Sequence, residues 1–440
     1  MLLILCKIID ILLSFRLDTW MRIGIDLRFY SPEPYGLSFH IRDLMEELLP
    51  LLEKEDGIDT ICLIFRHNIK GVDLSEKLSW WKLANGSQKF EIFYTNANYY
   101  TISEQTTFLF QLYRLNLDLM YFFTFNYPIL YDKPFIYQIL DLIVPKTKPK
   151  LSLKIQALLL CLKTGLKNAK HVLILGNNTK NDLKAFFNSN FEDRAKRNYI
   201  NHTVVYNGVN QKYLVQSQSN KTKADISGVK FDVALENKAK TILTNFKITK
   251  PYFYFISVWR KYKNIEKLVE AFEQFQYEND NKYQLVLSGT KDPDYPEVEV
   301  RIKASEQFGL GNIVITGKIE SDEDVICLYD QSLAMINPTL SEGFGLWMVE
   351  AASRSTNILC SDIEILREIA NPNEATFFDP DNVSDIVTKM NQYVSLDVKS
   401  QNEMVLRLHK TAEKFKWQNT AQIINNIIKT ISNDESRSEK

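Results

Sequence analysis

The sequence predicts an α/β protein with two doubly wound, parallel-sheet domains. The chain has 440 residues, which is more than one ordinary core organises and suits two domains of about 200 residues each. Short apolar runs alternate with helical patterns along nearly the whole chain, as is typical of parallel strands covered by helices. This alternation occurs in two successive blocks of about six strands each, so we expect two doubly wound sheets.

Each expected strand is an apolar run of four to six residues flanked by polar or turn-forming residues. The first block contains residues 22–26, 60–65, 90–94, 118–123, 135–140, 171–175 and 203–206. The second block contains residues 252–257, 283–288, 312–316, 333–337, 357–360 and 375–378. Two intervening segments have an apolar face at helical spacing, which predicts amphipathic helices. These faces are Ile41, Leu44, Met45, Leu48 and Leu49, and Ile265, Leu268, Val269, Phe272 and Phe275.

The composition excludes several functional classes. The chain is 45% hydrophobic and 24% charged, with a formal net charge of −1. Such a balance does not suggest a polyanion-binding surface, so nucleic acid is not an expected partner. The five cysteines and five histidines are scattered, without a CxxC pair. We therefore expect reduced thiols in a cytoplasmic protein, and no metal site.

Domain boundaries follow from changes in pattern. Residues 1–20 are expected to be an extension outside the fold, because their apolar run is interrupted by charge and is shorter than the roughly 20 residues that span a bilayer. A short membrane-surface anchor is the alternative. The first domain is expected at 21–208 and the second at 209–415, with a polar surface loop at 216–228. Residues 416–440 should form a C-terminal helix that returns toward the first domain, and a frayed tail from 432 onward.

The segment "NPTLSEGFGLWMVEAASRS" carries the most specific chemistry. Gly343 and Gly345 lack a Cβ, so backbone N–H groups there can approach a ligand closely. A helix follows, and its N-terminus favours an anion such as a phosphate. Glu342 and Glu350 lie on either side of this turn and can accept hydrogen bonds from hydroxyl groups. A phosphate flanked by two hydroxyl-bearing rings is a nucleotide-sugar, which we take as the hypothesis for the ligand.

Two further segments support this hypothesis. In "FISVWRKYKN" the cations Arg260, Lys261 and Lys263 follow a strand, and Asn264 is the expected N-cap of the next helix. Cations at the carboxyl end of a strand can neutralise a departing diphosphate. The segment "TGKIESDEDVICLYD" is another strand followed by a helix cap, whose backbone suits the edge of a base.

Together these segments resemble the retaining GT-B glycosyltransferases of family four, the glycosyl transferases group one. Glu342 and Glu350 match the two glutamates of the E-x7-E segment, and "VWRKYKN" resembles the phosphate-binding Lys-Asn segment. "SDIEILREIA", "FFDPDN" and "FKWQNTA" follow in the family's order. "YNGVN" is similar to the linker, and "MRIGIDLRFY" with "YGLSFHIRDLMEEL" to the opening of the first domain. The resemblance covers residues 21 to about 421.

The resemblance implies a GT-B fold, in which two Rossmann-like domains face an interdomain cleft, and it implies residue roles. Glu342 would contact the donor sugar and Glu350 the ribose. The backbone of Gly343, Phe344, Gly345 and Leu346 would hold the diphosphate together with Lys263. Ile319 would lie beside the base, and Gly36 would close on the diphosphate from the first domain. Arg260 and Asp141 complete the candidate catalytic set.

The implied reaction is transfer of a mannosyl- or glucosyl-type hexose from a nucleotide-sugar to a surface-glycan or lipid-linked acceptor. It would be retaining and would need neither metal nor cofactor. Leu140, however, stands where the family commonly has a histidine. The arginine that the family usually has near the start of the phosphate-binding segment is absent, since Ser257 and Val258 occupy those places, and Trp347 stands where the family usually has a proline. A catalytically silent homologue that binds a nucleotide-sugar or a partner glycosyltransferase is therefore the alternative, and a nucleotide-sugar epimerase of similar fold fits less well.

The family also implies peripheral contact with the inner face of a membrane through basic helices of the first domain. The candidate here is the lysine-rich segment 145–170. Lys163, Lys167 and Lys170 share one helical face. The alternative is a mostly buried helix whose basic last turn complements its own dipole.

Overall fold

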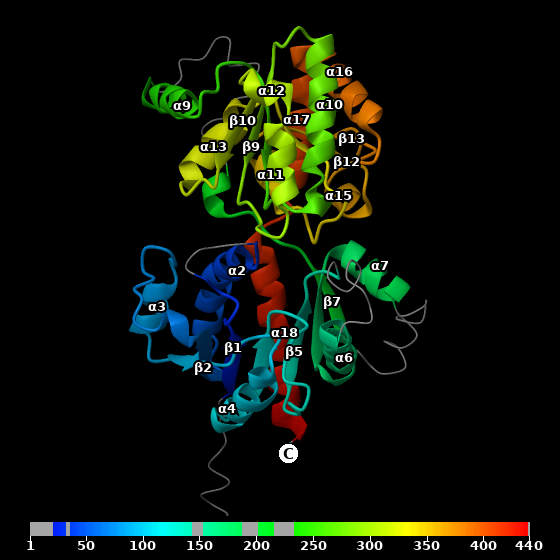
Figure 1. The fold of residues 1–440 in the computed structure, drawn as a ribbon. Coiled ribbons are helices and arrows are strands. Elements are labelled where there is room, and N and C mark those ends of the chain that lie inside the picture. Colours follow the sequence, from blue (N-terminus) through cyan, green and yellow to red (C-terminus); the bar gives the residue numbers. More distant parts are fainter. Residues whose placement is uncertain (1–20, 32–35, 143–152, 187–200, 215–232, 439–440) are drawn as a thin grey trace, which may run out of the picture. The chain divides into compact units, whose positions relative to one another are not determined.

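The computed structural model describes residues 21–31, 36–142, 153–186, 201–214 and 233–438 (Figure 1). The expected extension at 1–20 and the polar loop at 216–228 lie outside these residues. The chain divides into two compact units. The first unit runs to Gly208 and resumes at Trp417, and the second is Val209–Lys416.

The first unit alternates strands and helices. Its strands are β1 Met21–Asp26, β2 Ile58–Arg66, β3 Phe90–Thr95, β4 Leu119–Phe122, β5 Phe135–Ile139, β6 His171–Leu175 and β7 His202–Val205. Its helices are α2 Gly36–Glu53, η1 His67–Ile69, α3 Trp81–Gly86, η2 Glu104–Phe108, α4 Leu109–Arg114, α6 Leu153–Asn168, α7 Gly176–Phe186 and α18 Trp417–Ser438. The seven strands pair in the order β3-β2-β1-β4-β5-β6-β7, and every pair is parallel. The strand order reverses between β1 and β4, which is the point where doubly wound sheets bind ligands.

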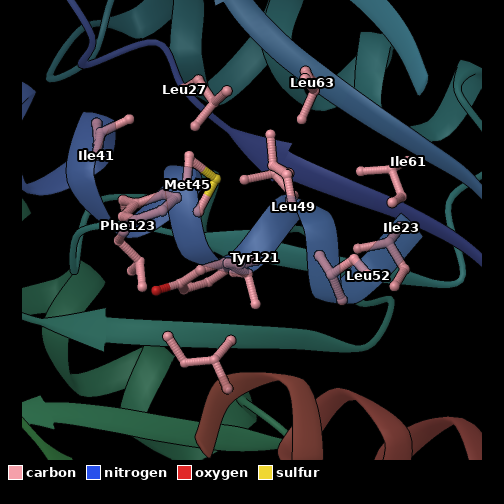
Figure 2. Packing of buried hydrophobic residues seen from close by; sticks show 14 of the residues in the cluster. Ile23, Leu27, Ile41, Met45, Leu49, Leu52, Ile61, Leu63, Tyr121 and Phe123 are labelled. Carbon is pink, nitrogen blue, oxygen red and sulfur yellow. The ribbon is translucent and has the colours of Figure 1, made fainter. Parts of the chain in front are cut away.

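Both faces of this sheet are buried, because successive side chains of a strand point to opposite faces. Ile23, Ile61 and Leu63 belong to a core that includes the apolar face of α2, and Figure 2 shows Met45 and Leu49 packed in that core. Cys62 and Ile64, one position along, belong to the core on the opposite face. Helix α18 packs beside α2. The amphipathic face predicted for residues 41–49 is confirmed, since all five of its side chains are buried.

The second unit has the same alternating plan. Its strands are β8 Tyr252–Ile256, β9 Gln284–Ser288, β10 Ile313–Gly317, β11 Ala334–Asn337, β12 Asn357–Ser361 and β13 Thr376–Phe378. Its helices are η3 Gln211–Tyr213, α9 Val233–Asn245, η5 Lys261–Lys263, α10 Ile265–Glu278, α11 Pro296–Lys303, α12 Glu306–Gly309, α13 Asp322–Gln331, α14 Leu346–Ser353, α15 Glu364–Ile369, α16 Val383–Ser395 and α17 Val398–Ala412. The strands pair in parallel in the order β10-β9-β8-β11-β12-β13. The second predicted face, on α10, is also confirmed, because its five side chains lie in the core of this unit.

Three local predictions were wrong. Asn264 precedes α10 but does not cap it with its side chain; its φ is 59°, and its amide donates instead to the carbonyl of Pro380 at 2.7 Å. Helix α6 is not mostly buried: one face is buried, whereas Leu153 is 84% exposed and Lys163 and Lys167 face solvent. Helix α18 continues to Ser438, beyond the predicted frayed end, because the polar residues after 431 are compatible with a helix.

Within the described ranges, the longest apolar stretches fall short of what a bilayer-crossing helix needs.

Candidate functional site

The glycine-containing turn joins β11 to α14, as the sequence predicted. Gly345 has a φ of 90° and directly precedes the helix. L-residues rarely adopt this conformation, and a Cβ at Gly345 would lie 2.8 Å from Cδ2 of Leu366. Phe344 is buried, with its ring 5.6 Å from that of Phe415, and Leu346 is half-buried. Gly343 is not among the residues with positive φ. The turn is therefore fixed mainly by Gly345, and α14 begins after the carboxyl end of β11, with its first N–H groups unpaired within the helix.

Glu342 is held at this edge by two donors. The ammonium of Lys263 lies 2.6 Å from its Oε1, and both side chains are only 9% exposed. The indole Nε1 of Trp347 donates to the same oxygen at 3.1 Å. Lys263 follows β8 and Glu342 follows β11, and these strands are neighbours in the sheet. The structure thus brings together two predicted residues that are 79 positions apart.

Glu350 lies one turn into α14 and is half-buried. Tyr329, at the end of α13, donates its hydroxyl to Oε2 of Glu350 at 3.1 Å. Burial raises the pKa of Tyr329 well above its usual value, and the charge of Glu350 raises it further. The tyrosine therefore stays protonated and remains a donor to the carboxylate. Sequence reasoning did not identify Tyr329, because its partner lies in another helix.

Arg260 takes a different partner from Lys263. Its Nε donates to Oδ2 of Asp292 at 2.7 Å, and its side chain is 47% exposed. This hydrogen bond lowers the pKa of Asp292. Arg260 therefore lies at the carboxyl edge as predicted, but an acidic side chain already engages its guanidinium.

The edge continues through the ends of β9 and β10. The N–H of Gly289 donates to the carbonyl of Gly317 at 2.9 Å. Gly289 has a φ of 123°, and a Cβ there would lie 1.7 Å from the carbonyl oxygen of Ser257. Ile319, the residue predicted beside a base, is half-buried two positions after β10. Close backbone approach between strand ends thus shapes the edge where Ile319 lies.

Two predicted residues belong to the first unit. Gly36 is the exposed first residue of α2, and space around a Cβ there is open to 4 Å. Asp141 follows β5 and is half-buried, as is Leu140 before it. The hydroxyl of Thr179 lies 3.4 Å from the carbonyl of Leu140, with geometry suited to donation.

A buried charge network in the first unit was missed by the sequence analysis. Arg28, fully buried after β1, donates to Asp26 at 2.8 Å and to Glu104 at 2.7 Å. Glu104 also accepts from the amide of Asn126, which follows β4. Burial raises the pKa of Glu104, although Arg28 opposes that shift. The signal available in the sequence was the pair of opposite charges at the end of the first strand, beside the switch point of the sheet.

The family model of the glycosyl transferases group 1 matches residues 240–415. This range contains β8 to β13, the paired Lys263 and Glu342, and Glu350. Residues 240–415 belong to the glycosyl transferases group 1 family. The two parallel-sheet units together have the GT-B fold, as the sequence predicted.

Curated proteins similar to this chain include bacterial mannosyltransferases. The Escherichia coli serotype-specific mannosyltransferase WbdA is 31% identical over 161 residues, which is 37% of this chain and 19% of WbdA. The Escherichia coli O-antigen chain mannosyltransferase B is 30% identical over 176 residues, or 40% of this chain and 45% of that protein. The chain therefore spans about a fifth of WbdA and less than half of the second relative.

Solved structures resemble the chain over nearly its whole length. HepE from Anabaena, in complex with UDP and glucose, covers 93% of this chain and all of its own, with a TM-score of 0.64 and 14% identity. WaaG, a glycosyltransferase involved in lipopolysaccharide biosynthesis, covers 92% of this chain and 99% of its own, with a TM-score of 0.64 and 12% identity. At these identities the likeness concerns the fold.

Proposed function

We propose that this protein is a retaining hexosyltransferase that uses a nucleotide-sugar donor. The sugar is of mannosyl or glucosyl type, and the acceptor is a surface glycan or a lipid-linked precursor. The observation that carries the proposal is the buried Lys263–Glu342 pair beside the N-terminus of α14, with Glu350 eight positions along. The mannosyltransferase relatives support the mannosyl option, and the neighbour with bound UDP and glucose supports the glucosyl option.

Each group at this edge has a role in the proposal. The ammonium of Lys263 and the N–H groups at the start of α14 bind the diphosphate, and charge accumulates there as the donor bond breaks. Glu342 accepts hydrogen bonds from hydroxyls of the sugar, while Glu350 accepts from the ribose. Arg260 contributes a further cation, and Ile319 packs beside the base. Because these groups supply positive charge, the proposed reaction needs no metal.

The proposed reaction replaces one bond at the anomeric carbon. The bond from that carbon to the diphosphate oxygen breaks, and a bond to the acceptor oxygen forms on the same face of the sugar. The hydroxyl proton of the acceptor passes to the leaving diphosphate. From the family resemblance, Gly36 and Asp141 remain candidate site residues of the first unit. We place the protein in the cytoplasm, with peripheral contact to the inner face of the membrane.

Binding of nucleoside diphosphates tests the proposal directly. We expect UDP, GDP or ADP to raise the melting temperature, since a ligand at about 100 times its Kd stabilises by about 2.7 kcal/mol. Each variant is compared with its own ligand-free form. Lys263→Met and Glu350→Ala should lose the shift, whereas Lys267→Met and Glu299→Ala, half-buried positions of the same unit that form other ion pairs, should keep it. No shift with any nucleotide would overturn the proposal.

A silent homologue is the second candidate, and Leu140 is the observation that favours it. An isobutyl group cannot replace an imidazole that contacts the reacting sugar. Slow hydrolysis of one nucleotide-sugar from a panel of donors would support an active hexosyltransferase. Binding without hydrolysis or transfer would support the silent homologue. Leu140→His sharpens the test, because a gain in turnover would identify the missing imidazole as the limit on the rate. An unchanged rate would indicate a different catalytic arrangement.

A further inference from the structure

We propose that Trp347 is a positioning residue that fixes Glu342 so that one carboxylate oxygen, Oε2, is presented to the donor sugar. This inference rests on the proposed function and assigns a role to a side chain that differs from the family's usual proline. Trp347 acts through Glu342 and not on the reacting atoms, so its effect is on recognition of the donor sugar.

The two oxygens of Glu342 have different surroundings. Oε1 accepts from Lys263 at 2.6 Å and from Trp347 at 3.1 Å. Among the residues that the structure describes, we find no donor to Oε2. Unlike the fully buried, unpartnered polar atoms of the described residues, Oε2 keeps some solvent-accessible surface. A carboxylate held at one oxygen leaves the other as a directed acceptor, and a sugar hydroxyl is the matching donor.

Lys263 alone would be a poor anchor for Glu342 once a donor is bound. The same ammonium is the nearest cation for a diphosphate, and an ammonium on a flexible stem turns readily toward a new anion. The indole N–H of Trp347 carries no charge, so a phosphate does not attract it as strongly. Trp347 therefore keeps Glu342 in place while Lys263 shares its hydrogen bonds with the ligand.

The indole is itself well fixed. Trp347 is the second residue of α14 and is 7% exposed. A buried aromatic ring on a helix has few accessible rotamers, so its N–H direction is set by packing. Proline at this position would have no side-chain donor at all. The substitution thus adds a hydrogen bond to the sugar-binding carboxylate.

Trp347→Phe tests this role, because phenylalanine keeps an aromatic ring but has no N–H. The control is Trp417→Phe: Trp417 is also buried, in the first unit, and its Nε1 has no hydrogen-bond partner among the described residues. Calorimetric titrations compare the affinity for UDP with that for UDP-glucose, and the affinity for GDP with that for GDP-mannose. The measured quantity is the ratio of the two dissociation constants, which isolates the contribution of the sugar.

We expect Trp347→Phe to leave nucleoside diphosphate affinity within about twofold and to lower the sugar's contribution about tenfold, the scale of one charge-assisted hydrogen bond. Trp417→Phe should change neither value. Turnover, where measurable, should show a raised KM for the donor. In the Glu342→Gln background the further effect of Trp347→Phe should largely disappear, because both changes act on the same contact.

The outcomes separate the two proposals. If wild-type protein binds no nucleoside diphosphate, the proposed function fails and the role of Trp347 fails with it. If wild-type protein binds both ligands and Trp347→Phe keeps the full sugar contribution, the role of Trp347 is refuted while the proposed function stands. Equal weakening of nucleoside diphosphate and nucleotide-sugar binding by Trp347→Phe would indicate a general packing defect. That result would also refute the role of Trp347.

Discussion

The Lys263–Glu342 ion pair gives the sharpest prediction about the second unit. Both side chains are 9% exposed, so each charge has lost most of its hydration and depends on the other. Removing one partner of a buried pair costs about 3–5 kcal/mol. We expect about 3 kcal/mol for Lys263→Met, at the low end, because Glu342 keeps the Trp347 donor.

A double-mutant cycle separates the pair from its surroundings. Glu342→Gln keeps the shape of the side chain and removes its charge. In that background Lys263→Met should cost only about 1 kcal/mol, since the lysine no longer neutralises a carboxylate. The coupling free energy is then about 2 kcal/mol, which lies within the range for contacting charged residues.

Urea unfolding measured for all four proteins gives these free energies. For a unit of about 200 residues, 3 kcal/mol corresponds to about 6–12 °C in melting temperature, which provides a second readout. Lys267→Met is the matched control: Lys267 pairs with Asp381 at 2.7 Å, but their side chains are 33% and 73% exposed. Its loss should cost at most about 1 kcal/mol. A coupling below about 0.5 kcal/mol would refute the view that the two charges depend on each other.

Three further predictions concern other parts of the chain. Gly289→Ala should cost at least about 3 kcal/mol, since φ is 123° and the new Cβ would meet the carbonyl oxygen of Ser257 at 1.7 Å. Gly317→Ala, also at positive φ but with open space around the new Cβ, should cost about 1 kcal/mol by urea unfolding. Equal costs for the two substitutions would contradict the steric explanation.

Burial lowers the pKa of His40 to about 4, so the folded state binds fewer protons than the unfolded state, in which the pKa is about 6.5. The contribution of His40 to the stability of the first unit should be complete well above pH 6.5, should fall by about 2 kcal/mol between pH 7.5 and 5, and should level off below pH 4. His40→Gln should flatten that slope in unfolding experiments across this range, and an unchanged slope would count against His40 as its source.

Much of the fold was predictable because it is encoded locally. All thirteen expected strands are present, and both predicted amphipathic faces are buried. Apolar periodicity determines these features within a few residues along the chain. The positions of the candidate site residues after β8, β10 and β11 were predictable for the same reason, since the carboxyl ends of neighbouring parallel strands meet at one edge.

The partner of each charged side chain was not predictable from the sequence. Lys263 and Arg260 are three positions apart in one basic segment, yet one is buried against Glu342 and the other pairs with Asp292 near the surface. Asn264 has the residue type of an N-cap but donates to a carbonyl 116 positions away. Such choices depend on which strand ends the crossover connections bring together.

The sequence by itself determined the two sheets, their strands, and the sheet edge at which the candidate site residues lie. The tertiary structure decided that Trp347 and Lys263 share one oxygen of Glu342, and that Tyr329 supports Glu350. The physical reason is range: periodicity acts between near neighbours in the chain, whereas hydrogen bonds and desolvation depend on atoms that folding alone brings into contact.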